Sequence, residues 1–293
     1  MGRLTYPAWM GCLADVGSPS GSYRGAMSSV SYQQFTGTAA ENYQRDFVPA
    51  IATPVSQLLL RAAGLRPGER VLDVACGTGL ISRLAAERVG AAGSVIGIDI
   101  SADMIDVAKA VPAPHTIDWR IADAVALPIP DNAIDVVLCQ MGLMFMENRT
   151  GAIAEMRRVL VPSGRAVVAT PGHIQPLFEV MERAIVEQIS ADLGGFVSSV
   201  FSMHDPEDVT AQLREGGLHD VSATVLTTTL RLPPPAQFLW QYINLTPMAA
   251  LIGQAPDRAK EAMERQFVDG TRPDVVDGVT VVEQPMVIAT GRA

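Results

Sequence analysis

Apolar residues in this chain form short runs that alternate with segments of helical periodicity. Val71–Cys76, Ile134–Cys139 and Ala166–Thr170 are nearly continuous apolar runs, which is typical of strands buried on both faces of a parallel sheet. Ile117–Ile121 instead alternates apolar and polar residues, as a half-exposed strand does. Between the runs, residues 80–89 place apolar side chains at helical spacing. The pattern predicts an α/β fold with the continuous runs central and the alternating strand outermost.

The first apolar run leads into a glycine turn, Cys76-Gly77-Thr78-Gly79. Glycine permits a tight turn and brings backbone N–H groups close to a ligand. The next run, Ser94–Asp99, ends on a carboxylate about 20 residues beyond the turn, the spacing at which an acid binds a ribose in nucleotide-binding βαβ units. We therefore expect a nucleotide-like ligand across the carboxyl ends of these two strands.

The residues around the turn indicate which nucleotide is bound. Ser82 stands where a dinucleotide fingerprint needs a third glycine or alanine, and no P-loop lysine follows the turn. Asp73, inside the first strand, would repel a pyrophosphate and suits a cation. S-adenosylmethionine has an ammonium, a sulfonium and an adenosine but no phosphate, so the charges favour it. The alternatives are an NAD(P)-dependent oxidoreductase and a cofactor-binding protein of the same fold that lacks transferase activity.

Several motifs then follow in order: Val71–Gly79, Asp99, Ala122-Asp123-Ala124, Ile134–Gln140 and Leu160–Gly164. In this order and spacing the chain resembles the class I S-adenosylmethionine-dependent methyltransferases, and among them the ubiquinone/menaquinone-type small-molecule methyltransferases. The resemblance covers about residues 35–172. It implies a Rossmann-like fold with a seven-stranded, mostly parallel sheet of order 3-2-1-4-5-7-6 and helical lid insertions.

The resemblance also assigns roles in binding S-adenosyl-L-methionine. Asp73 is expected to favour the cationic methionine end, Asp99 to accept from the ribose hydroxyls and Asp123 to accept from the adenine amino group. Ile100 and Met104 are expected to pack on the adenine, although Met104 also suits a core position. The complete expected cofactor site is Asp73, Ala75, Cys76, Gly77, Gly79, Asp99, Ile100, Met104, Ala122, Asp123, Ala124 and Gln140.

Methyl transfer from a sulfonium is an in-line displacement with an activated leaving group, so we expect catalysis by proximity and water exclusion, without a metal. His173, just after the fifth strand, is the candidate general base, with a surface or capping role as the alternative. An aromatic and aliphatic cluster beyond residue 232 predicts a hydrophobic or aromatic substrate, such as a quinone precursor or a natural product of secondary metabolism. The expected substrate-pocket residues are Phe35, Tyr43, Met141, Met144, Phe145, Trp240 and Tyr242.

The remaining segments suggest how the chain is organised. Residues 1–31 are rich in Gly, Ser and Pro and are predicted to be a flexible N-terminal arm; an arm that folds over the substrate or swaps into a partner chain is the alternative. Residues 32–293 are assigned to one methyltransferase domain, with lid elements at about 32–64, 175–203 and 233–277. Helix breaks are expected near Pro49 and Pro54, and Pro285 predicts a bulge or a later start in the last strand.

Composition narrows the partners and the compartment. The formal net charge is −9 and the arginines are scattered, which argues against a nucleic-acid partner. The three cysteines form no CxxC pair and the four histidines are isolated, which suits a reducing cytosol and no metal site. The uncharged stretch 232–256 contains five prolines, so it is not expected to span a membrane. We expect a cytoplasmic protein acting on a small molecule, with a homodimer as the candidate assembly.

Overall fold

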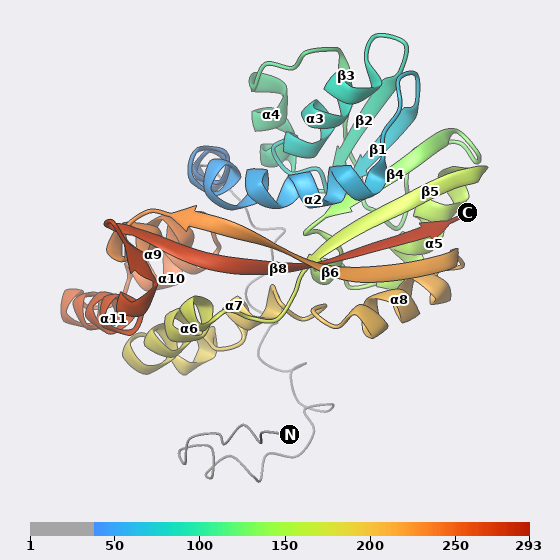
Figure 1. Cartoon of the computed structure of the whole chain (residues 1–293). Helices are drawn as coiled ribbons and strands as arrows, with labels where there is room; N and C mark the ends of the chain where they lie inside the picture. The colour runs from blue at the N-terminus through green and yellow to red at the C-terminus, as the bar shows by residue number, and fades with distance from the viewer. Residues whose placement is uncertain (1–37) are drawn as a thin grey trace, which may run out of the picture.

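A computed structural model describes residues 38–293, arranged around one twisted sheet (Figure 1). The expected arm, 1–31, and Phe35 lie outside the described residues. The strand order is β3-β2-β1-β4-β5-β8-β6, and the short β7 pairs with β8. The strands are β1 (Arg70–Val74), β2 (Ser94–Asp99), β3 (Ile117–Ile121), β4 (Ile134–Gln140), β5 (Leu160–Pro171), β6 (His219–Leu232), β7 (Val275–Val276) and β8 (Val279–Arg292).

The sheet is parallel from β3 to β5 and antiparallel beyond it. β1 pairs with β2 on one side and with β4 on the other, and β8 runs antiparallel to both β5 and β6. Because β7 has two residues and pairs with β8 alone, β8 takes the place expected for the seventh strand, and the predicted order is confirmed with one added short strand. The alternating segment is outermost, as β3, and the continuous apolar runs are central.

Helices cover both faces of the sheet. In Figure 1, α2 and α8 lie on opposite faces of the β5–β8–β6 part. The helices are α1 (Thr38–Asn42), the π-helix η4 (Tyr43–Ala52), α2 (Thr53–Ala63), α3 (Leu80–Val89), α4 (Ala102–Ala110), η5 (Leu143–Phe145), α5 (Arg149–Val159), α6 (Pro176–Gln188), η6 (Ala191–Leu193), α7 (Phe196–Ser199), α8 (Pro206–Glu215), α9 (Pro235–Asn244), α10 (Met248–Gly253), α11 (Asp257–Gly270) and η7 (Arg272–Asp274).

Strands β6 and β8 extend past the end of β5. β5 pairs with β8 only as far as Pro171 opposite Met286, whereas β6 stays paired with β8 as far as Leu232 opposite Thr280. Figure 1 shows α9, α10 and α11 gathered around this two-stranded extension, with α6 beside them. α11 packs against both α6 and α9. The extension therefore carries a helical cap over the carboxyl end of the parallel strands.

The N-terminal helical segment departs from the expected break. The sequence predicts two helices interrupted near Pro49 and Pro54, but α1, η4 and α2 follow one another without a gap. Pro49 lies inside η4, and the N–H of Thr53 bonds to the carbonyl of Val48, five residues back. A π-helical stretch accommodates a residue without an N–H, because its hydrogen bonds already depart from the i→i−4 pattern. Pro54 occupies the first turn of α2, a position at which proline is common.

The last strand also differs from expectation. β8 runs from Val279 to Arg292 with no register shift at Pro285, so neither a bulge nor a late start occurs there. The carbonyl of Pro285 accepts from Gly172 N at 2.8 Å, so this residue's hydrogen-bonding side faces β5. β5 ends at Pro171, which is paired with Met286. Pro285 lies one residue beyond this last β5–β8 pair, so the N–H that it lacks removes no hydrogen bond from the ladder.

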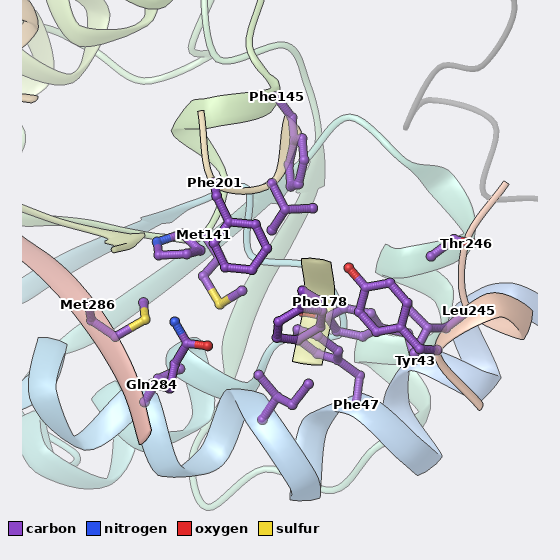
Figure 2. Close-up of a pocket in the computed structure, with 15 residues that line it drawn as sticks. Tyr43, Phe47, Met141, Phe145, Phe178, Phe201, Leu245, Thr246, Gln284 and Met286 are labelled. Atoms are coloured by element: carbon purple, nitrogen blue, oxygen red, sulfur yellow. The ribbon is translucent and has the colours of Figure 1, made fainter. Parts of the chain in front are cut away.

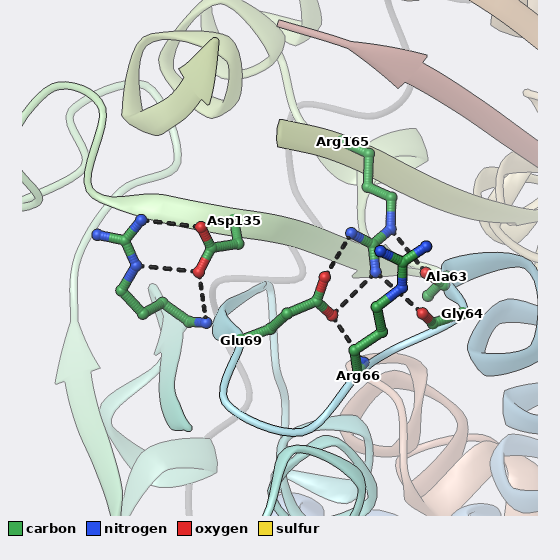
Figure 3. Close-up of polar contacts among 7 residues, drawn as sticks. Ala63, Gly64, Arg66, Glu69, Asp135 and Arg165 are labelled. Carbon is green, nitrogen blue, oxygen red and sulfur yellow. Dashed lines mark hydrogen bonds and ion pairs between the residues drawn. The ribbon is translucent and has the colours of Figure 1, made fainter. Parts of the chain in front are cut away.

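Ion pairs fasten the C-terminal end of α2 to the sheet (Figure 3). Arg165, on β5, donates to the backbone oxygens of Ala63 and Gly64 and to both carboxylate oxygens of Glu69. Gly64 is left-handed (φ 52°) and ends the helix. The last carbonyls of a helix lack partners within it, and a cation there also interacts favourably with the helix dipole. Arg165 therefore sets the position of the helix that carries part of the site.

Candidate functional site

Two adjoining cavities lie at the carboxyl ends of β1 and β4. The larger has an empty volume of about 660 Å³ and the smaller about 340 Å³, both including space open to solvent. Tyr43, at the start of η4, lines both. The smaller cavity is lined by Tyr43, Val48, Ala52, Asp73, Ala75, Cys76, Gly77, Thr78, Leu80, Ile81 and Gln140. The predicted glycine turn thus opens into a cavity that η4 covers.

The turn after β1 has backbone angles that most residues avoid. Ala75 and Gly77 have φ of 56° and 53°, in the left-handed region. A Cβ on Gly77 would meet only Tyr43 Cε1, at 3.8 Å, so this glycine faces the cavity. The N–H of Gly77 donates to Asp99 Oδ2 at 2.8 Å, which joins the turn to the end of β2. Strained residues of this kind cluster at ligand sites, where the surrounding fold holds them in place.

Gly79 serves a different purpose from Gly77. Its φ is 83°, and a Cβ there would lie 2.3 Å from the ring of Trp119, on β3. A Cβ on Gly97, the β2 residue paired with Trp119, would lie 2.5 Å from the same ring. The second glycine of the turn is therefore required by the indole packed over it, and the first by the cavity.

Asp73 is buried in the floor of the smaller cavity, with 1% of its surface exposed. Ser82 Oγ, on α3, donates to its Oδ2 at 2.6 Å. Burial raises the pKa of the Asp73 carboxyl to about 7; the Ser82 hydrogen bond opposes this rise, and the charge of Asp99 adds to it. A carboxyl held this way readily ionises when a cation enters the cavity, because an opposite charge nearby favours the ionised form.

Two polar atoms in the lining of this cavity lack partners. Thr78 Oγ1 and Gln140 Oε1 are buried and make no hydrogen bond within the described residues, although Gln140 Nε2 donates to Ala52 O at 3.4 Å. Buried polar atoms are normally hydrogen-bonded, and leaving one unpaired costs about 1–3 kcal/mol. A hydroxyl and an amide oxygen suit the carboxylate and the ammonium of an amino acid, so the residues present fit the methionine end of S-adenosylmethionine.

The ends of β2 and β3 form the neighbouring part of the site. Asp99 accepts from the N–H groups of Gly77 and Ser101, and burial raises the pKa of its carboxyl. Ser101 caps α4 by accepting from Met104 N. Ile100 is 45% exposed, which leaves its side chain open to a ligand, whereas Met104 is 6% exposed and packs in the core.

Residues after β3 are the more exposed part of the predicted cofactor site. Asp123 is exposed, and its Oδ1 accepts from Val125 N at 3.1 Å. Ala122 and Ala124 beside it are half-buried and pack against the core. The Ala122 N–H donates to Asp99 O at 3.1 Å, which holds this turn against the end of β2. The structure therefore brings the turns after β1, β2 and β3 together along one edge of the sheet.

The larger cavity is apolar and aromatic (Figure 2). Phe178, on α6, packs against Phe201 and Tyr242, with ring centroids 5.2 and 5.5 Å apart. Tyr43 stacks on Phe47 at 4.7 Å. The lining residues are Tyr43, Phe47, Ile51, Val55, Met141, Phe145, Pro171, Phe178, Val200, Phe201, Tyr242, Leu245, Thr246, Gln284 and Met286. The wall thus combines η4, α2, the ends of β4 and β5, the cap helices and β8.

The predicted substrate residues divide between this cavity and other places. Tyr43, Met141, Phe145 and Tyr242 line it. Met144 is buried in the core, outside the lining. Trp240 points its indole N–H at Glu264 and so connects α9 to α11.

His173, the candidate base, is exposed and is absent from the lining of either cavity. Its ring lies against that of His204, with centroids 4.7 Å apart. The residue follows β5 as expected, but it lines neither cavity. Its catalytic role stays a prediction.

The sequence did not single out most of the other lining residues, among them Phe178, Phe201, Gln284 and Met286. Phe178 and Phe201 fall inside the predicted lid element 175–203, but the sequence does not indicate that their side chains face the cavity. Gln284 has no distinguishing local signal, because it stands between Glu283 and Pro285, and the sequence prediction for this strand concerns Pro285 alone.

Comparison with known proteins agrees with this geometry. Residues 72–168 match the family model described as a methyltransferase domain. The chain is 34% identical over 172 residues to the ubiquinone/menaquinone biosynthesis C-methyltransferase UbiE of Paraburkholderia phymatum, which covers 54% of this chain and 71% of that protein. It is also 34% identical over 117 residues to the 2-phytyl-1,4-naphtoquinone methyltransferase of Trichormus variabilis, covering 38% of this chain and 51% of the relative.

Solved structures share the fold at low sequence identity. Phosphoethanolamine N-methyltransferase 2 of Haemonchus contortus, in complex with S-adenosyl-L-methionine, aligns with a TM-score of 0.55 and 17% identity over 88% of this chain and 57% of that chain. A methyltransferase of Haloferax volcanii in complex with the Trm112 activator aligns with a TM-score of 0.53 and 16% identity over 89% and 97% of the two chains. In the part of this chain that the structure describes, no helix has the length and apolarity needed to cross a bilayer.

Proposed function

Because this chain belongs to the ubiquinone/menaquinone-type family of class I S-adenosylmethionine-dependent methyltransferases, we propose that it methylates a quinone-type or related aromatic small molecule held in the larger cavity. The observation that carries this proposal is the pair of adjoining cavities, one with unpaired polar atoms and the other aromatic, which meet at Tyr43. A donor and an acceptor placed in the two spaces would face each other there.

The smaller cavity is the proposed place of the methionine end of the cofactor. Asp73 would stabilise its positive charge, Gln140 Oε1 would accept from the ammonium, and Thr78 Oγ1 would bond to the carboxylate. Asp99 would accept from the ribose hydroxyls while keeping its bonds to Gly77 and Ser101, because a carboxylate has about four acceptor sites. Ile100 and the turn Ala122-Asp123-Ala124 would receive the adenine.

The larger cavity is the proposed substrate site. It lies between η4, the cap helices and β8, and its lining is predominantly apolar, as is typical of small-molecule sites. Aromatic walls from Phe178, Phe201 and Tyr242 suit a planar, apolar ring, since offset and edge-to-face packing both contribute to binding. The two quinone-methyltransferase relatives support a quinone-type ring; a natural product of secondary metabolism with a similar ring would fit the same walls.

The chain's own contribution to the reaction is placement and exclusion of water. S-adenosylmethionine, when bound, supplies an activated methyl group. Tyr43 borders both cavities, and burial together with the charges of Asp99 and Asp73 raises the pKa of its hydroxyl, so it stays protonated near neutral pH. It would therefore act as a neutral hydrogen-bond donor at the junction. With His173 outside both cavities, proximity and orientation are the proposed source of rate enhancement.

The proposed lid elements lie at about 32–64, 175–203 and 233–277; residues 32–37 are outside the described part of the chain, and η4, α6 and α9, within the three segments, supply lining residues that support the proposal. All three would cover the substrate after it binds. The acidic composition and the sparse cysteines support a cytoplasmic location.

A homodimer formed through β6 is also proposed. Within the described residues β6 is an edge strand, and Val225 and Leu226 at its centre are 47% and 37% exposed. No charged residue occurs from Val221 to Leu230, so antiparallel pairing of two copies about this centre would bring no like charges together. Light scattering should give a dimer for the wild type and a monomer for Val225→Lys; a monomeric wild type would contradict this assembly.

Calorimetric titration tests the proposed function directly. S-adenosylmethionine should bind while NAD does not, and Asp99→Asn should weaken the cofactor by about 1–3 kcal/mol, the cost of a lost buried hydrogen bond. Asp106→Asn, an exposed carboxylate on α4 that pairs with Lys109, is the matched control and should leave the affinity unchanged. Release of S-adenosylhomocysteine with hydroxylated naphthalenes, and none with phosphoethanolamine, would support the substrate class; the reverse preference would overturn it.

A further inference from the structure

Gln284 is a buried amide in a cavity whose walls are otherwise mostly apolar. It lies on β8, is 4% exposed and lines the larger cavity together with Met286, two positions along the same strand (Figure 2). Thr246, another polar lining residue, lies between α9 and α10 and already donates its hydroxyl to the carbonyl of Ile243 at 2.8 Å. Gln284 therefore presents polar atoms to the cavity that its own element does not require.

A hydrogen bond determines how this amide is oriented. The Nε2 of Gln284 donates to the carbonyl of Pro285 at 2.8 Å. Only the NH₂ side of an amide can face a carbonyl oxygen, so Oε1 is the atom directed elsewhere. Among the described residues Oε1 has no hydrogen-bond partner. An acceptor that can be reached from the cavity is therefore left without a protein donor, among walls that are mostly apolar.

The fold does not need this amide. The carbonyl of Pro285 already accepts from Gly172 N at 2.8 Å and would remain satisfied without Gln284. The backbone of Gln284 keeps its place opposite Thr228 in the β6–β8 ladder whatever its side chain. Methionine, which stands two residues along at position 286, has a similar length and would fill the same space with apolar atoms. An unpaired acceptor where an apolar side chain would suffice points to a ligand that supplies the donor.

We propose that Gln284 is a specificity-determining residue whose Oε1 accepts a hydrogen bond from a hydroxyl group on the aromatic substrate. This inference rests on the proposed function and specifies that the aromatic ring carries a hydroxyl group that the cavity recognises. A phenolic or enolic hydroxyl satisfies the acceptor, whereas the corresponding methyl ether offers no donor and leaves Oε1 unpaired. A site built to hydrogen-bond a hydroxyl rejects an analogue that lacks it much more strongly than an apolar pocket can.

The test compares a matched pair of probes, 1-naphthol and 1-methoxynaphthalene, by calorimetry on the full chain saturated with S-adenosylhomocysteine. The wild type should bind the naphthol at least about tenfold more tightly than the ether. Gln284→Met should reduce that ratio to about twofold or less, mainly by weakening naphthol binding. Thr246→Val, which removes a hydroxyl whose proton is already used inside the protein, is the control and should keep the wild-type ratio.

The possible failures are distinguishable. If neither naphthalene binds the wild type, the aromatic substrate class is wrong, and the role of Gln284 falls with it. If the naphthol and the ether bind the wild type equally well, Gln284 does not accept a hydrogen bond from the hydroxyl group, and the proposed methyl transfer is unaffected. An unchanged ratio of naphthol to ether affinity in Gln284→Met would assign the preference for the hydroxyl to another group. The affinity for S-adenosylhomocysteine, measured on the same samples, shows whether the variant is folded.

Discussion

Ser82 Oγ donates a 2.6 Å hydrogen bond to Oδ2 of Asp73, and both residues are buried beneath the glycine turn. In the sequence, Ser82 counts against a dinucleotide fingerprint and Asp73 against a pyrophosphate. In the structure the two are one unit, in which the hydroxyl of α3 stabilises the carboxylate of β1. The departure from the dinucleotide pattern therefore has a structural role: it holds the charged group that favours a cation.

Cofactor binding should depend on pH through Asp73. The pKa of this carboxyl is about 7 in the protein, and a cationic ligand favours its ionised form, so binding below pH 7 requires loss of a proton. The affinity for S-adenosylmethionine should therefore rise as the pH is raised from 5 to about 7 and then level off. Calorimetry across this range checks it, and Ser82→Ala should move the midpoint to higher pH. Tighter binding at low pH would contradict the assignment.

The same carboxyl should lower the stability of the ligand-free protein near neutral pH. Its pKa is 3.8 when unperturbed and about 7 in the fold, so between these values the folded state holds more protons than the unfolded state. The free energy of unfolding then falls as the pH rises from about 4 to about 7. Asp73→Asn should raise the melting temperature at pH 7.5 and leave it almost unchanged at pH 4. Equal changes at both pH values would show that the carboxylate charge is not responsible.

The two glycines of the turn should respond differently to alanine. Both need a left-handed backbone, which costs a non-glycine residue about 1–2 kcal/mol. Gly79→Ala also drives a Cβ into Trp119, so we expect the larger loss of unfolding free energy in a denaturant titration. Gly77→Ala meets no close atom, so its stability loss should be limited to the backbone cost while cofactor affinity falls. Similar losses of stability would mean that the indole adapts to the added methyl group.

Tyr43 is predicted to act through its ring and its position more than through proton transfer. Burial and the charges of Asp99 and Asp73 raise the pKa of its hydroxyl, so it is not a base near neutral pH. Tyr43→Phe keeps the stacking on Phe47 and should lower kcat about tenfold or less, whereas Tyr43→Ala opens the wall between the cavities and should lower kcat/KM by at least about a hundredfold. Equal losses in the two variants would assign the effect to the hydroxyl.

Arg165 should contribute more to stability than a surface ion pair. Its guanidinium bonds to Glu69 and to two carbonyls at the end of α2 and is about a quarter exposed (Figure 3). Arg165→Met should lower the free energy of unfolding by about 2–3 kcal/mol, since hydrogen bonds to charged groups contribute about 1.5–3 kcal/mol. Arg272→Met removes an exposed pair with Asp269 and should cost less than about 1 kcal/mol. Comparable losses in urea titrations would show that the contacts to α2 contribute nothing beyond an exposed pair.

Local patterns along the chain were sufficient for the parallel half of the fold, and they place the residues of the predicted cofactor site at one edge of the sheet. The run Val71–Cys76 is nearly continuous because β1 is central and covered on both faces. The run Ile117–Ile121 alternates because β3 is at the edge of the sheet and half-exposed. The glycine turn and Asp99 lie close together because the carboxyl ends of neighbouring parallel strands meet at one edge.

Tertiary structure alone decided what surrounds the substrate cavity. Phe178, Tyr242 and Gln284 come from α6, α9 and β8, which are well separated along the chain, and nothing local indicates that they face one space. Whether Pro49 breaks a helix or lies in a π-helical stretch also depends on what packs against it. Periodicity reports which residues are buried, because burial depends on local spacing; which buried residues meet depends on how distant elements pack, and no short stretch of sequence encodes that.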